Sequence, residues 1–557
     1  MINIYEKIPS KVPGITSLFI DFDYNVDILN IIKSFPCKNY SKKTKIWELP
    51  ITYLSELLDK LCVYDDINLK LYNFKMEEDK VYKLSNYKTK PYTYQKEGIE
   101  YGLNHNKWLL LDDPGLGKTL QLIYLAQELK KRDKIKHCLI ICGINSLKTN
   151  WKKEIEKHSA LTATILGEYT TKTGKIRYGA NAKKLEHLKK GINEFFVIVN
   201  IEAIRDNKIV NEILKQKDDY EMIVVDEIHV CKKDSSSQGH NLLKLTKAKY
   251  VVGATGTLML NEPLDVFVPF KFAGIDNSTA TNFKNYYCIY GGKFGHDFLG
   301  YHNLDIIKKQ LELFSLRRKK DLLNLPEKTV IAEYVDMSDE QETFYEQVKE
   351  GIKDSVDKVN LTYSAAFSMI MRLRQATACP NILTTNNIPS AKIDRACSLC
   401  EEIINTGNKV VIFSTFKDTV KVLQEKLSKF NPLIGTGDTE ETDLSNYIDM
   451  FQNDEEHKIF IGTWQKCGTG ITLNKASYMI FIDTPWTDGA FKQACDRIHR
   501  IGTEKPVFIY NLVTTNTVDE QVLQILNNKC ALSEYLIDNE INNEALNILQ
   551  KYIEELR

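Results

Sequence analysis

The feature that most constrains the fold of this chain is a glycine-containing loop between an apolar segment and a helical pattern. The loop reads Asp112-Asp113-Pro114-Gly115-Leu116-Gly117-Lys118-Thr119 and follows the apolar run 108–111. Backbone N–H groups of such a loop surround phosphate oxygens, while the lysine reaches the outer phosphates and the hydroxyl holds Mg²⁺. The pattern predicts a strand–loop–helix unit that binds a nucleotide.

A second run supplies the carboxylates that phosphoryl transfer to water requires. Met222-Ile223-Val224-Val225 is an apolar strand pattern, and Asp226-Glu227-Ile228-His229 follows it directly. A buried strand would deliver Asp226 to the metal and place Glu227 where the attacking water sits. The two runs together predict a protein that binds and hydrolyses ATP with Mg²⁺.

Strand and helix patterns divide the chain, whose 557 residues are too many for one hydrophobic core. Residues 1–80 predict a small α+β accessory module, and a lysine-rich segment from Glu78 to Lys90 reads as a linker. Residues 86–330 and 331–557 each predict a parallel-sheet lobe with a helical insertion, and 258–400 reads as mostly helical. The predicted strands are 108–112, 138–142, 195–200, 222–226 and 250–253 in the first lobe, then 409–413, 458–462 and 478–483 in the second. The predicted fold class is therefore α/β.

Composition limits the partners. The chain has 74 Lys plus Arg and 74 Asp plus Glu, so any nucleic-acid contact must be a local patch and not a basic coat. Most of the twelve cysteines lie singly in apolar runs, which is typical of reduced core residues. No run reaches the ~18 apolar residues of a membrane span, and the N-terminus lacks an apolar signal. We expect a soluble monomer in the cytoplasm, or in the nucleus of a eukaryote, with no membrane contact.

Several ordered blocks resemble one family. They are Tyr94-Gln95-Lys96, the glycine loop, Asp226 to His229, Gly253-Ala254-Thr255-Gly256-Thr257, and Gln493 to Gly502 on a predicted helix. Taken in order, they resemble the Swi/Snf-type ATPases of helicase superfamily two over residues 86 to 525. Weaker similarities include 139–155 with Trp151, Leu373-Arg374-Gln375 and Gly468-Thr469-Gly470, and Gly143 stands where the family often has proline. The resemblance implies two RecA-like lobes with ATP in the cleft between them.

The resemblance also implies roles for individual residues. Lys118, Asp226, Glu227, Arg497 and Arg500 would be catalytic, the two arginines acting as fingers on the transition state. Thr119 and Asp226 would hold Mg²⁺. The residues implied to contact ATP are Gln95, at the adenine edge, with Asp113, Gly115, Leu116, Gly117, Lys118, Thr119, Leu120 and Gly470.

Possible DNA contacts lie in two regions. The N-terminal module resembles the HARP-type domain of annealing helicases through the 19–22 strand and Lys45-Ile46-Trp47, which implies phosphate contacts by Lys42, Lys43 and Lys45. Trp47 would then stack on an unpaired base, whereas the alternative is that it belongs to the core. Further candidates are Lys148, Thr415, Trp464 and Lys466.

Other motifs have two interpretations each. Cys397-Ser398-Leu399-Cys400 has the spacing of half a zinc site, but a helical apolar pattern favours core cysteines and no zinc. His229 and His499 are either general bases or links between neighbouring blocks, and we favour links. Arg317-Arg318-Lys319-Lys320 is a nuclear signal, a phosphate track or, as family position favours, a structural brace between lobes. A degenerate phosphate loop is the alternative to an active site.

The residues and the resemblance predict a DNA-stimulated, Mg²⁺-dependent ATPase that translocates on duplex DNA. It would remodel branched DNA or displace DNA-bound protein, with or without a protein partner. An RNA-directed helicase is one alternative. Another is a clamp whose DNA affinity ATP switches without productive translocation.

Overall fold

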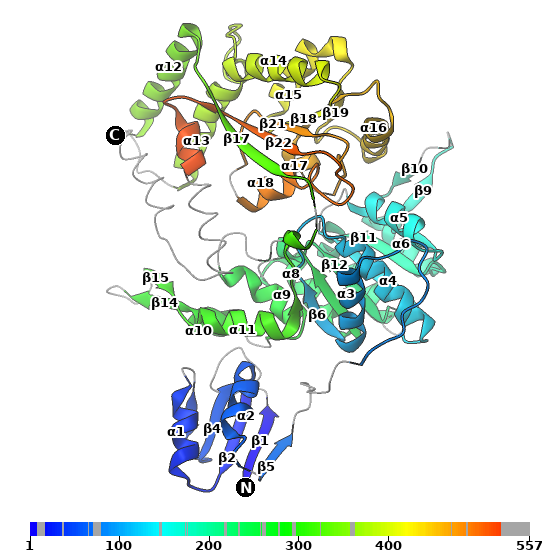
Figure 1. The fold of residues 1–557 in the computed structure, drawn as a ribbon, viewed down its shortest axis with the longest axis vertical. Helices are drawn as coiled ribbons and strands as arrows, with labels where there is room; N and C mark the ends of the chain where they lie inside the picture. Colours follow the sequence, from blue (N-terminus) through cyan, green and yellow to red (C-terminus); the bar gives the residue numbers. More distant parts are fainter. Residues whose placement is uncertain are drawn as a thin grey trace. The chain divides into compact units, whose positions relative to one another are not determined.

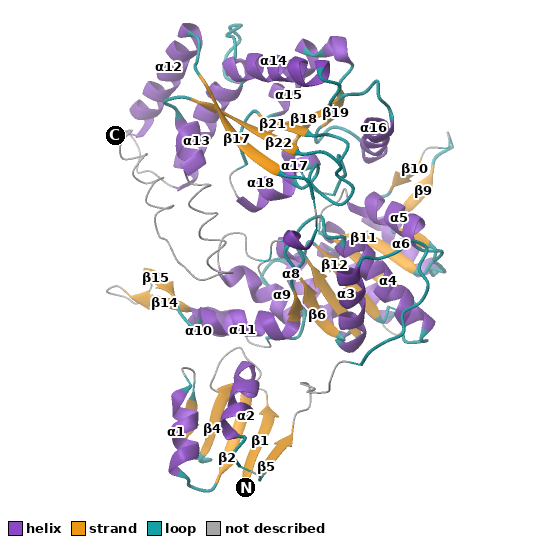
Figure 2. Cartoon of the chain, in the orientation of Figure 1, coloured by secondary structure: helices purple, strands orange, loops and turns teal. Residues whose placement is uncertain are grey.

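The computed structural model describes residues 1–524 with gaps, and Figures 1 and 2 show the helices and strands. The gaps are 8–16, 36–37, 65, 71–79, 144–146, 173, 175, 217–219, 232–233, 257, 259–262, 277–278, 292–296, 324, 357–362, 469 and 486–487. The chain divides into two compact units. The first comprises Met1–Asp113 and Lys118–Arg318, and the second comprises Pro114–Gly117 and the residues from Lys319 onward.

The N-terminal module is an α+β fold around one mixed sheet. In spatial order the strands are β3 (Asn39–Ser41), β4 (Ile46–Pro50), β2 (Ser17–Phe22), β1 (Ile2–Lys7) and β5 (Ile67–Lys70). Only the β1–β5 pair is parallel. Helices α1 (Val26–Ser34) and α2 (Leu54–Leu61) bury Ile28, Ile32, Leu54, Leu57 and Leu61. The sequence pattern predicts the last strand of this module over 67–74, and residues 71–74 of that range lie outside the described residues.

The first lobe is built on a seven-stranded sheet in which every neighbouring pair is parallel. Its spatial order is β16 (Ser315–Leu316), β6 (Lys107–Leu110), β13 (Tyr250–Ala254), β12 (Met222–Asp226), β7 (Cys138–Cys142), β11 (Phe196–Asn200) and β8 (Ala163–Ile165). The predicted strands at 138–142 and 222–226 have the observed bounds. Register pairs Asp226 with Ala254 on one side and with Cys142 on the other.

Both faces of this sheet are covered, which explains why its strands are apolar at successive positions. Residues 138, 140 and 142 of β7 join one hydrophobic cluster, and residues 139 and 141 join the other. Helices α3 (Thr93–Asn104), α4 (Lys118–Lys131) and α5 (Leu147–His158) pack on the first cluster. The second receives α6 (Asn181–Lys190), α7 (Asn207–Lys215), α8 (Ser237–Lys244), α9 (Phe267–Phe272) and α11 (Leu304–Phe314). Beyond the sheet lie α10 (Ala280–Tyr287) and the hairpins β9 (Glu168–Thr170) with β10 (Ile176–Tyr178) and β14 (Cys288–Gly291) with β15 (Asp297–Tyr301).

The second lobe has its own parallel sheet of six strands. Their order is β17 (Lys328–Val335), β22 (Val507–Thr514), β21 (Tyr478–Phe481), β18 (Val410–Ser414), β20 (Ile459–Thr463) and β19 (Leu433–Gly435). Helices α14 (Ala391–Asn405) and α15 (Lys417–Lys426) cover one face. The other carries α16 (Glu441–Asn453), α17 (Trp464–Cys467) and α18 (Asp488–Cys495). Helices α12 (Asp339–Val356) and α13 (Tyr363–Ala378) share a smaller apolar cluster. The predicted α/β class with two parallel-sheet lobes is confirmed.

The chain from 258 to 400 is mostly helical where it is described, as predicted, but it also supplies β16 at the edge of the first sheet and β17 at the edge of the second. One local prediction is wrong. The predicted helix over Gln493 to Gly502 ends at Cys495, and the following residues form turns with Gly502 at φ 92°. Charge and hydropathy patterns within a few residues cannot reveal these pairings and turns, because they depend on sheet register.

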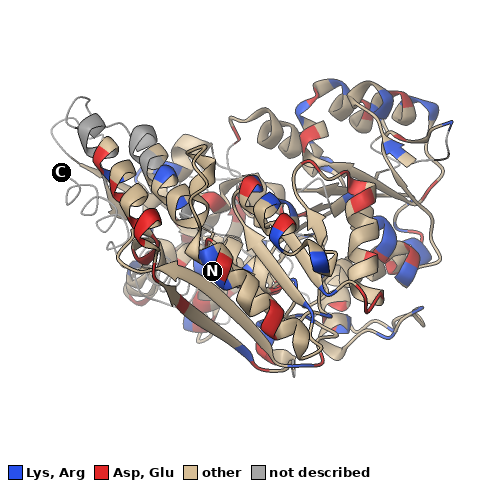
Figure 3. Ribbon diagram, turned by 90° about the horizontal axis from the view of Figure 1, so that it is seen from above, with Lys and Arg blue, Asp and Glu red and all other residues tan. Residues whose placement is uncertain are grey.

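Charged residues are spread over the helices of both units, with acidic and basic positions interspersed (Figure 3). This distribution agrees with the zero net charge. Among the described residues, no helix is both long and apolar enough to cross a membrane.

Candidate nucleotide-binding site

The glycine loop connects the end of the β6 segment to the first residue of α4, as the sequence predicts. Gly115 and Gly117 have φ values of 89° and 75°, a region that glycine enters without steric cost. Leu116 between them is buried. Lys118 begins α4, and its Nζ donates hydrogen bonds to the carbonyl oxygen of Asp112 at 2.8 Å and that of Asp113 at 3.4 Å. The Lys118 ammonium is therefore held by the first two residues of its own loop.

Asp226 ends β12 and is oriented from two directions. The indole nitrogen of Trp151 in α5 donates to Asp226 Oδ2 at 2.8 Å, and the backbone N–H of Glu227 donates to Oδ1 at 3.1 Å. Asp226 is 7% exposed and Trp151 is 1% exposed. Burial, followed by the charge of Glu227, raises the pKa of Asp226, and the hydrogen bond from Trp151 opposes that rise. A cation near this carboxylate would stabilise its ionised form.

Glu227 leaves the strand in an unusual backbone conformation and has its own partners. Its φ and ψ are 54° and 49°, the left-handed region that a non-glycine residue rarely occupies. Thr255 Oγ1 donates to Glu227 Oε2 at 3.0 Å, and His229 Nδ1 lies 3.1 Å from the same oxygen. Burial alone would raise the pKa of Glu227, but the hydrogen bond and charge of His229 hold it below the usual value. Glu227 is thus kept ionised.

His229 joins two of the sequence blocks. Its Nδ1 lies 2.7 Å from Thr255 Oγ1, at the end of β13, and 3.1 Å from Glu227 Oε2. The contact links the carboxylate pair to the Gly253–Thr257 block, of which Thr257 lies outside the described residues. This geometry agrees with a linking role for His229.

Gly143 allows the chain after β7 to pass directly beside this carboxylate pair. Its N–H donates to the carbonyl oxygen of Asp226 at 2.8 Å. A Cβ at this position would lie 2.7 Å from the carbonyl oxygens of both Asp226 and Glu227 and 3.1 Å from the Glu227 Cβ. Glycine is therefore required here by close backbone approach, which gives a physical reason for its presence in this chain.

Gln95 is buried at the start of α3. Its Oε1 accepts a hydrogen bond from the backbone N–H of Tyr92 at 3.0 Å, so the side chain caps the helix that it belongs to. Asp113, Thr119 and Leu120 are half-buried around the loop. These residues cluster with Lys118 by chain connectivity, so their proximity was expected from sequence.

The two predicted arginine fingers lie in the turns after α18. Arg497 donates through Nε to the carbonyl oxygen of Gln493 at 2.8 Å and through Nη1 to that of Ile471 at 3.2 Å. Arg500 Nη1 lies 3.4 Å from the same Ile471 oxygen and donates to Thr472 Oγ1 at 2.7 Å. Both guanidinium groups are therefore held beside the segment that follows Gly470, whose φ is 75°. Thr469 of that block lies outside the described residues.

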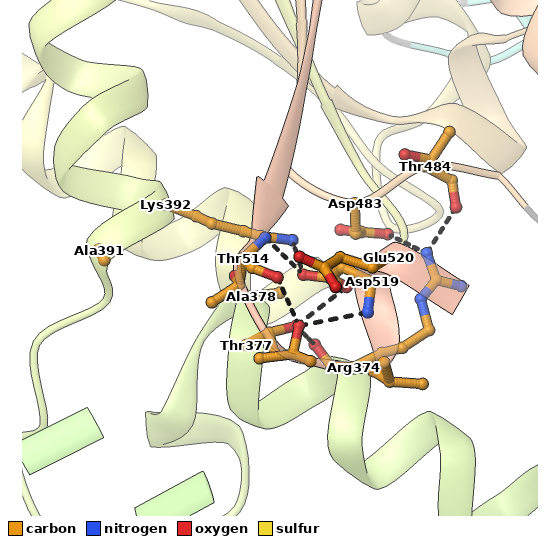
Figure 4. A network of polar contacts seen from close by, with 12 residues as sticks. Arg374, Thr377, Ala378, Ala391, Lys392, Asp483, Thr484, Thr514, Asp519 and Glu520 are labelled. Atoms are coloured by element: carbon orange, nitrogen blue, oxygen red, sulfur yellow. Dashed lines mark hydrogen bonds and ion pairs between the residues drawn. The ribbon is translucent and has the colours of Figure 1, made fainter. Parts of the chain in front are cut away.

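Two predicted DNA contacts share one hydrogen-bond network in the second lobe. Trp464 Nε1 donates to Thr415 Oγ1 at 3.0 Å, and the backbone N–H of Thr415 donates to Asp483 Oδ1 at 2.9 Å. The buried Arg374 guanidinium lies 3.6 Å from Asp483 and donates to the Thr484 carbonyl (Figure 4). The same helix, α13, places Thr377 against Asp519, which also pairs with Lys392 (Figure 4). Lys466, on α17, is half-exposed.

The remaining predicted DNA contacts differ in exposure. Lys42, Lys43 and Lys45 are exposed in the turn between β3 and β4, and Lys45 has a φ of 58°. Trp47 is half-buried, packs against the hydrophobic core and lies beside Tyr40, with 4.8 Å between ring centroids. Lys148 is only 3% exposed and its ammonium lies 4.9 Å from the centre of the Tyr178 ring. This burial does not favour Lys148 as a contact to DNA.

The two cysteines of the Cys397–Cys400 motif and His499 are wholly or partly buried in the second lobe. Cys397 and Cys400 lie in α14, where burial raises the pKa of both thiols, to about 11 and about 12. His499 Nε2 lies 2.8 Å from the Pro326 carbonyl oxygen, and burial lowers the pKa of His499. Both histidines thus connect separate blocks of the chain.

Sequence reasoning missed three partners of the carboxylates and the loop. Trp151 and Thr255 were only parts of family blocks, without a role, and Arg318 was only part of a basic cluster. Arg318 donates two hydrogen bonds to the buried carboxylate of Asp112, through Nε at 2.9 Å and Nη2 at 2.6 Å. No local pattern signals such pairs, since they join residues far apart in the chain.

The two parallel sheets, the glycine loop and the adjacent carboxylates of Asp226 and Glu227 define the class of helicase-like nucleotide-binding proteins. Residues 94–382 match the SNF2-related domain, and residues 391–502 match the helicase conserved C-terminal domain. The chain therefore belongs to the SNF2-related family of helicase-like ATPases.

Individual proteins show the same relationship. A Mycoplasma pneumoniae protein named an uncharacterized ATP-dependent helicase is 27% identical over 490 residues, which are 86% of this chain and 44% of that protein. The Drosophila melanogaster SWI/SNF-related matrix-associated actin-dependent regulator of chromatin subfamily A-like protein 1 is 24% identical over 91% of this chain and 65% of its own length. A solved structure, the Sulfolobus solfataricus SWI2/SNF2 ATPase core in complex with dsDNA, is 23% identical over 87% of this chain and 98% of that chain, with a TM-score of 0.35. This chain spans less than half of the mycoplasma relative.

Proposed function

We propose that this protein is a DNA-stimulated, Mg²⁺-dependent ATPase that translocates along duplex DNA. The observation that carries the proposal is the pair of the buried Asp226 and the half-buried Glu227, each held by its own partners in the lobe that also contains Lys118. Their surroundings raise the pKa of Asp226 and lower the pKa of Glu227, which suits the two carboxyl groups to different roles in the reaction. Membership of the SNF2-related family supports the same reaction.

Each proposed role follows from the chemistry of the side chain. Backbone N–H groups of the loop and Lys118 would bind the phosphates, which requires Lys118 to leave the Asp112 carbonyl that it now contacts. Glu227, kept ionised by His229 and Thr255, would orient a water molecule and accept its proton as the bond to the outer phosphorus forms. The bond between that phosphorus and the bridging oxygen breaks, and ADP departs.

The residues present fit a magnesium ion. Mg²⁺ prefers oxygen ligands, and the Asp226 carboxylate and the Thr119 hydroxyl supply them. When bound, the ion would neutralise charge on the phosphates as the bond breaks. Trp151 would hold the Asp226 carboxylate in one orientation for that ion.

Arg497 and Arg500 are proposed to stabilise the transition state from the second lobe. A guanidinium group keeps its charge and presents several donors in one plane, which matches the oxygens of a transferring phosphoryl group. Because the arginines and Lys118 lie in different units, their joint action requires the lobes to close on ATP. Cycles of closure and reopening would move the protein along DNA.

The DNA substrate is proposed to be a duplex with a branch. The exposed turn with Lys42, Lys43 and Lys45 would contact phosphates, and Thr415, Trp464 and Lys466 would contact DNA on the second lobe. The Drosophila match leaves only about 50 residues of this chain outside it, so it includes part of the N-terminal module. Remodelling of branched DNA, or removal of a bound protein, is the proposed outcome.

The test compares steady-state ATPase rates without nucleic acid and with single-stranded DNA, linear duplex, forked DNA and duplex RNA, using Lys118→Ala as the blank. We expect the largest rise with duplex or forked DNA. A larger rise with duplex RNA would replace the DNA translocase by an RNA-directed enzyme. Displacement of a third strand from a triplex then tests movement, because a clamp would leave that strand in place despite ATP.

A further inference from the structure

The chain passes from the first lobe to the second at Arg318, Lys319 and Lys320, and the side chains of Arg318 and Lys320 are each held by hydrogen bonds and an ion pair. β16 runs beside the chain that enters the glycine loop, with Leu111 N–H donating to the Leu316 carbonyl at 2.8 Å and Asp113 N–H donating to the Arg318 carbonyl at 3.0 Å. Arg318 is the last residue of the first unit, and from Lys319 onward the chain belongs to the second unit, which also includes Pro114–Gly117. The crossing therefore starts at the entrance of the phosphate loop.

Arg318 is anchored entirely within the first unit. Besides its two bonds to the Asp112 carboxylate, its Nη2 donates to Gln121 Oε1 at 2.6 Å and its Nη1 donates to the Tyr94 carbonyl. Gln121 Nε2 in turn donates to Asp112 Oδ2 at 2.9 Å. Asp112 is 0% exposed, so the paired charges are desolvated and their geometry is strictly held.

The neighbouring helix leaves room for this arrangement. A Cβ on Gly98 of α3 would clash with Gln121 Oε1 and would lie 2.9 Å from Arg318 Nη2. The Arg318 side chain thus joins α3, which contains Gln95, to the first residue of the loop and to the first turns of α4. None of its partners Tyr94, Asp112 and Gln121 is a predicted site residue.

Lys320 is anchored in the second unit. Its Nζ pairs with Asp496 Oδ1 at 2.5 Å and donates to the carbonyl of His499, so it holds both ends of the turn that contains Arg497. His499 Nε2 also lies 2.8 Å from the Pro326 carbonyl oxygen, two positions before β17 begins at Lys328. Burial lowers the pKa of Lys320, while the charge of Asp496 opposes that change.

We propose that Arg318 and Lys320 are paired positioning residues that couple the phosphate loop to the arginine turn through the single residue between them. The proposal rests on the ATPase function proposed above. Lys118 contacts the carbonyl of Asp112, the residue whose carboxylate Arg318 grips. A phosphate that draws Lys118 away therefore removes a hydrogen bond from Asp112, the residue to which Arg318 is attached. The other end holds the turn that presents Arg497 and Arg500.

The decisive variant keeps both anchors and lengthens the chain between them. Two glycines inserted between Lys319 and Lys320 should leave the Kd of a fluorescent ADP analogue within about twofold and lower kcat at saturating ATP at least about tenfold. Lys320→Met should likewise lower kcat with little change in ADP affinity, and Lys320→Arg should restore part of the rate. Arg318→Lys should weaken ADP binding as well, because a lysine cannot reproduce the two-pronged contact.

Arg317→Met is the matched control, since Arg317 carries the same charge in the same segment and is exposed. Its basal kcat and ADP affinity should match the unmodified protein. A normal kcat for the glycine insertion would overturn the coupling, as would equal losses in Arg317→Met and Lys320→Met. If the unmodified full-length chain hydrolyses no ATP with or without DNA, the proposed function itself fails, and that result is seen before any variant is compared.

Discussion

The hydrogen bond from Trp151 to Asp226 provides a direct test of how the metal ligand is oriented. Trp151→Phe removes the indole N–H but keeps an aromatic ring against the buried carboxylate. We expect the variant to need more Mg²⁺ for ATP hydrolysis, because the Asp226 carboxylate loses the donor that fixes the position of Oδ2 at 2.8 Å. We expect a smaller effect on kcat once Mg²⁺ is saturating.

The magnitude follows from two general observations. A hydrogen bond to a charged group contributes about 1.5–3 kcal/mol to stability, and loss of a partner that orients a metal ligand lowers metal affinity about 10–100-fold. Trp108→Phe is a matched control, because Trp108 is also 1% exposed and in the first lobe, and its indole nitrogen has no hydrogen-bond partner among the described residues. Both variants remove the same atoms, so their difference isolates the bond to Asp226.

The assay is steady-state phosphate release over a series of free Mg²⁺ concentrations, at saturating ATP and duplex DNA. The concentration for half-maximal rate should rise about 10–100-fold for Trp151→Phe and less than about twofold for Trp108→Phe. Thermal unfolding with Mg²⁺ absent gives a second readout, in which Trp151→Phe should be the less stable variant. Equal Mg²⁺ requirements in the two variants would refute the orienting role of Trp151.

Three further predictions follow from the site. In ATPase assays, Gly143→Ala should lower kcat at least about tenfold, because the added Cβ would lie 2.7 Å from two carbonyl oxygens and would displace Glu227. Gly351→Ala is the control and should leave kcat unchanged, because its Cβ would meet no atom within 4 Å. Without Mg²⁺, the free energy of unfolding of the first lobe should fall as the pH rises through about 6, because the folded lobe holds the proton of Asp226 more tightly than the unfolded chain does. Asp226→Asn should flatten this pH dependence in thermal unfolding. Replacing the lysines of the Lys42–Lys45 turn with alanine should weaken forked-DNA binding and reduce its salt dependence by about 0.9 per lost phosphate contact, and an unchanged slope in a fluorescence titration would place DNA elsewhere.

Local patterns were sufficient for the parts of the site that are contiguous in sequence. Lys118 opens a helix after a glycine loop, and Asp226 ends a strand, because short-range hydrophobicity and glycine positions specify those elements. The same patterns failed at the Gln493 to Gly502 block. Its helix stops at Cys495, where the chain turns so that Lys320 can hold Asp496 and His499.

By itself the sequence determined the α/β class, the two lobes, the phosphate loop and the carboxylate pair, because each depends on residues that are neighbours in the chain. Only the tertiary structure decided which side chains hold them. Trp151 and Asp226 are 75 positions apart, and Arg318 and Asp112 are 206 positions apart. Such pairs form only when parallel strands align in register and helices pack on both faces, so their partners are set by the whole lobe and not by any local pattern.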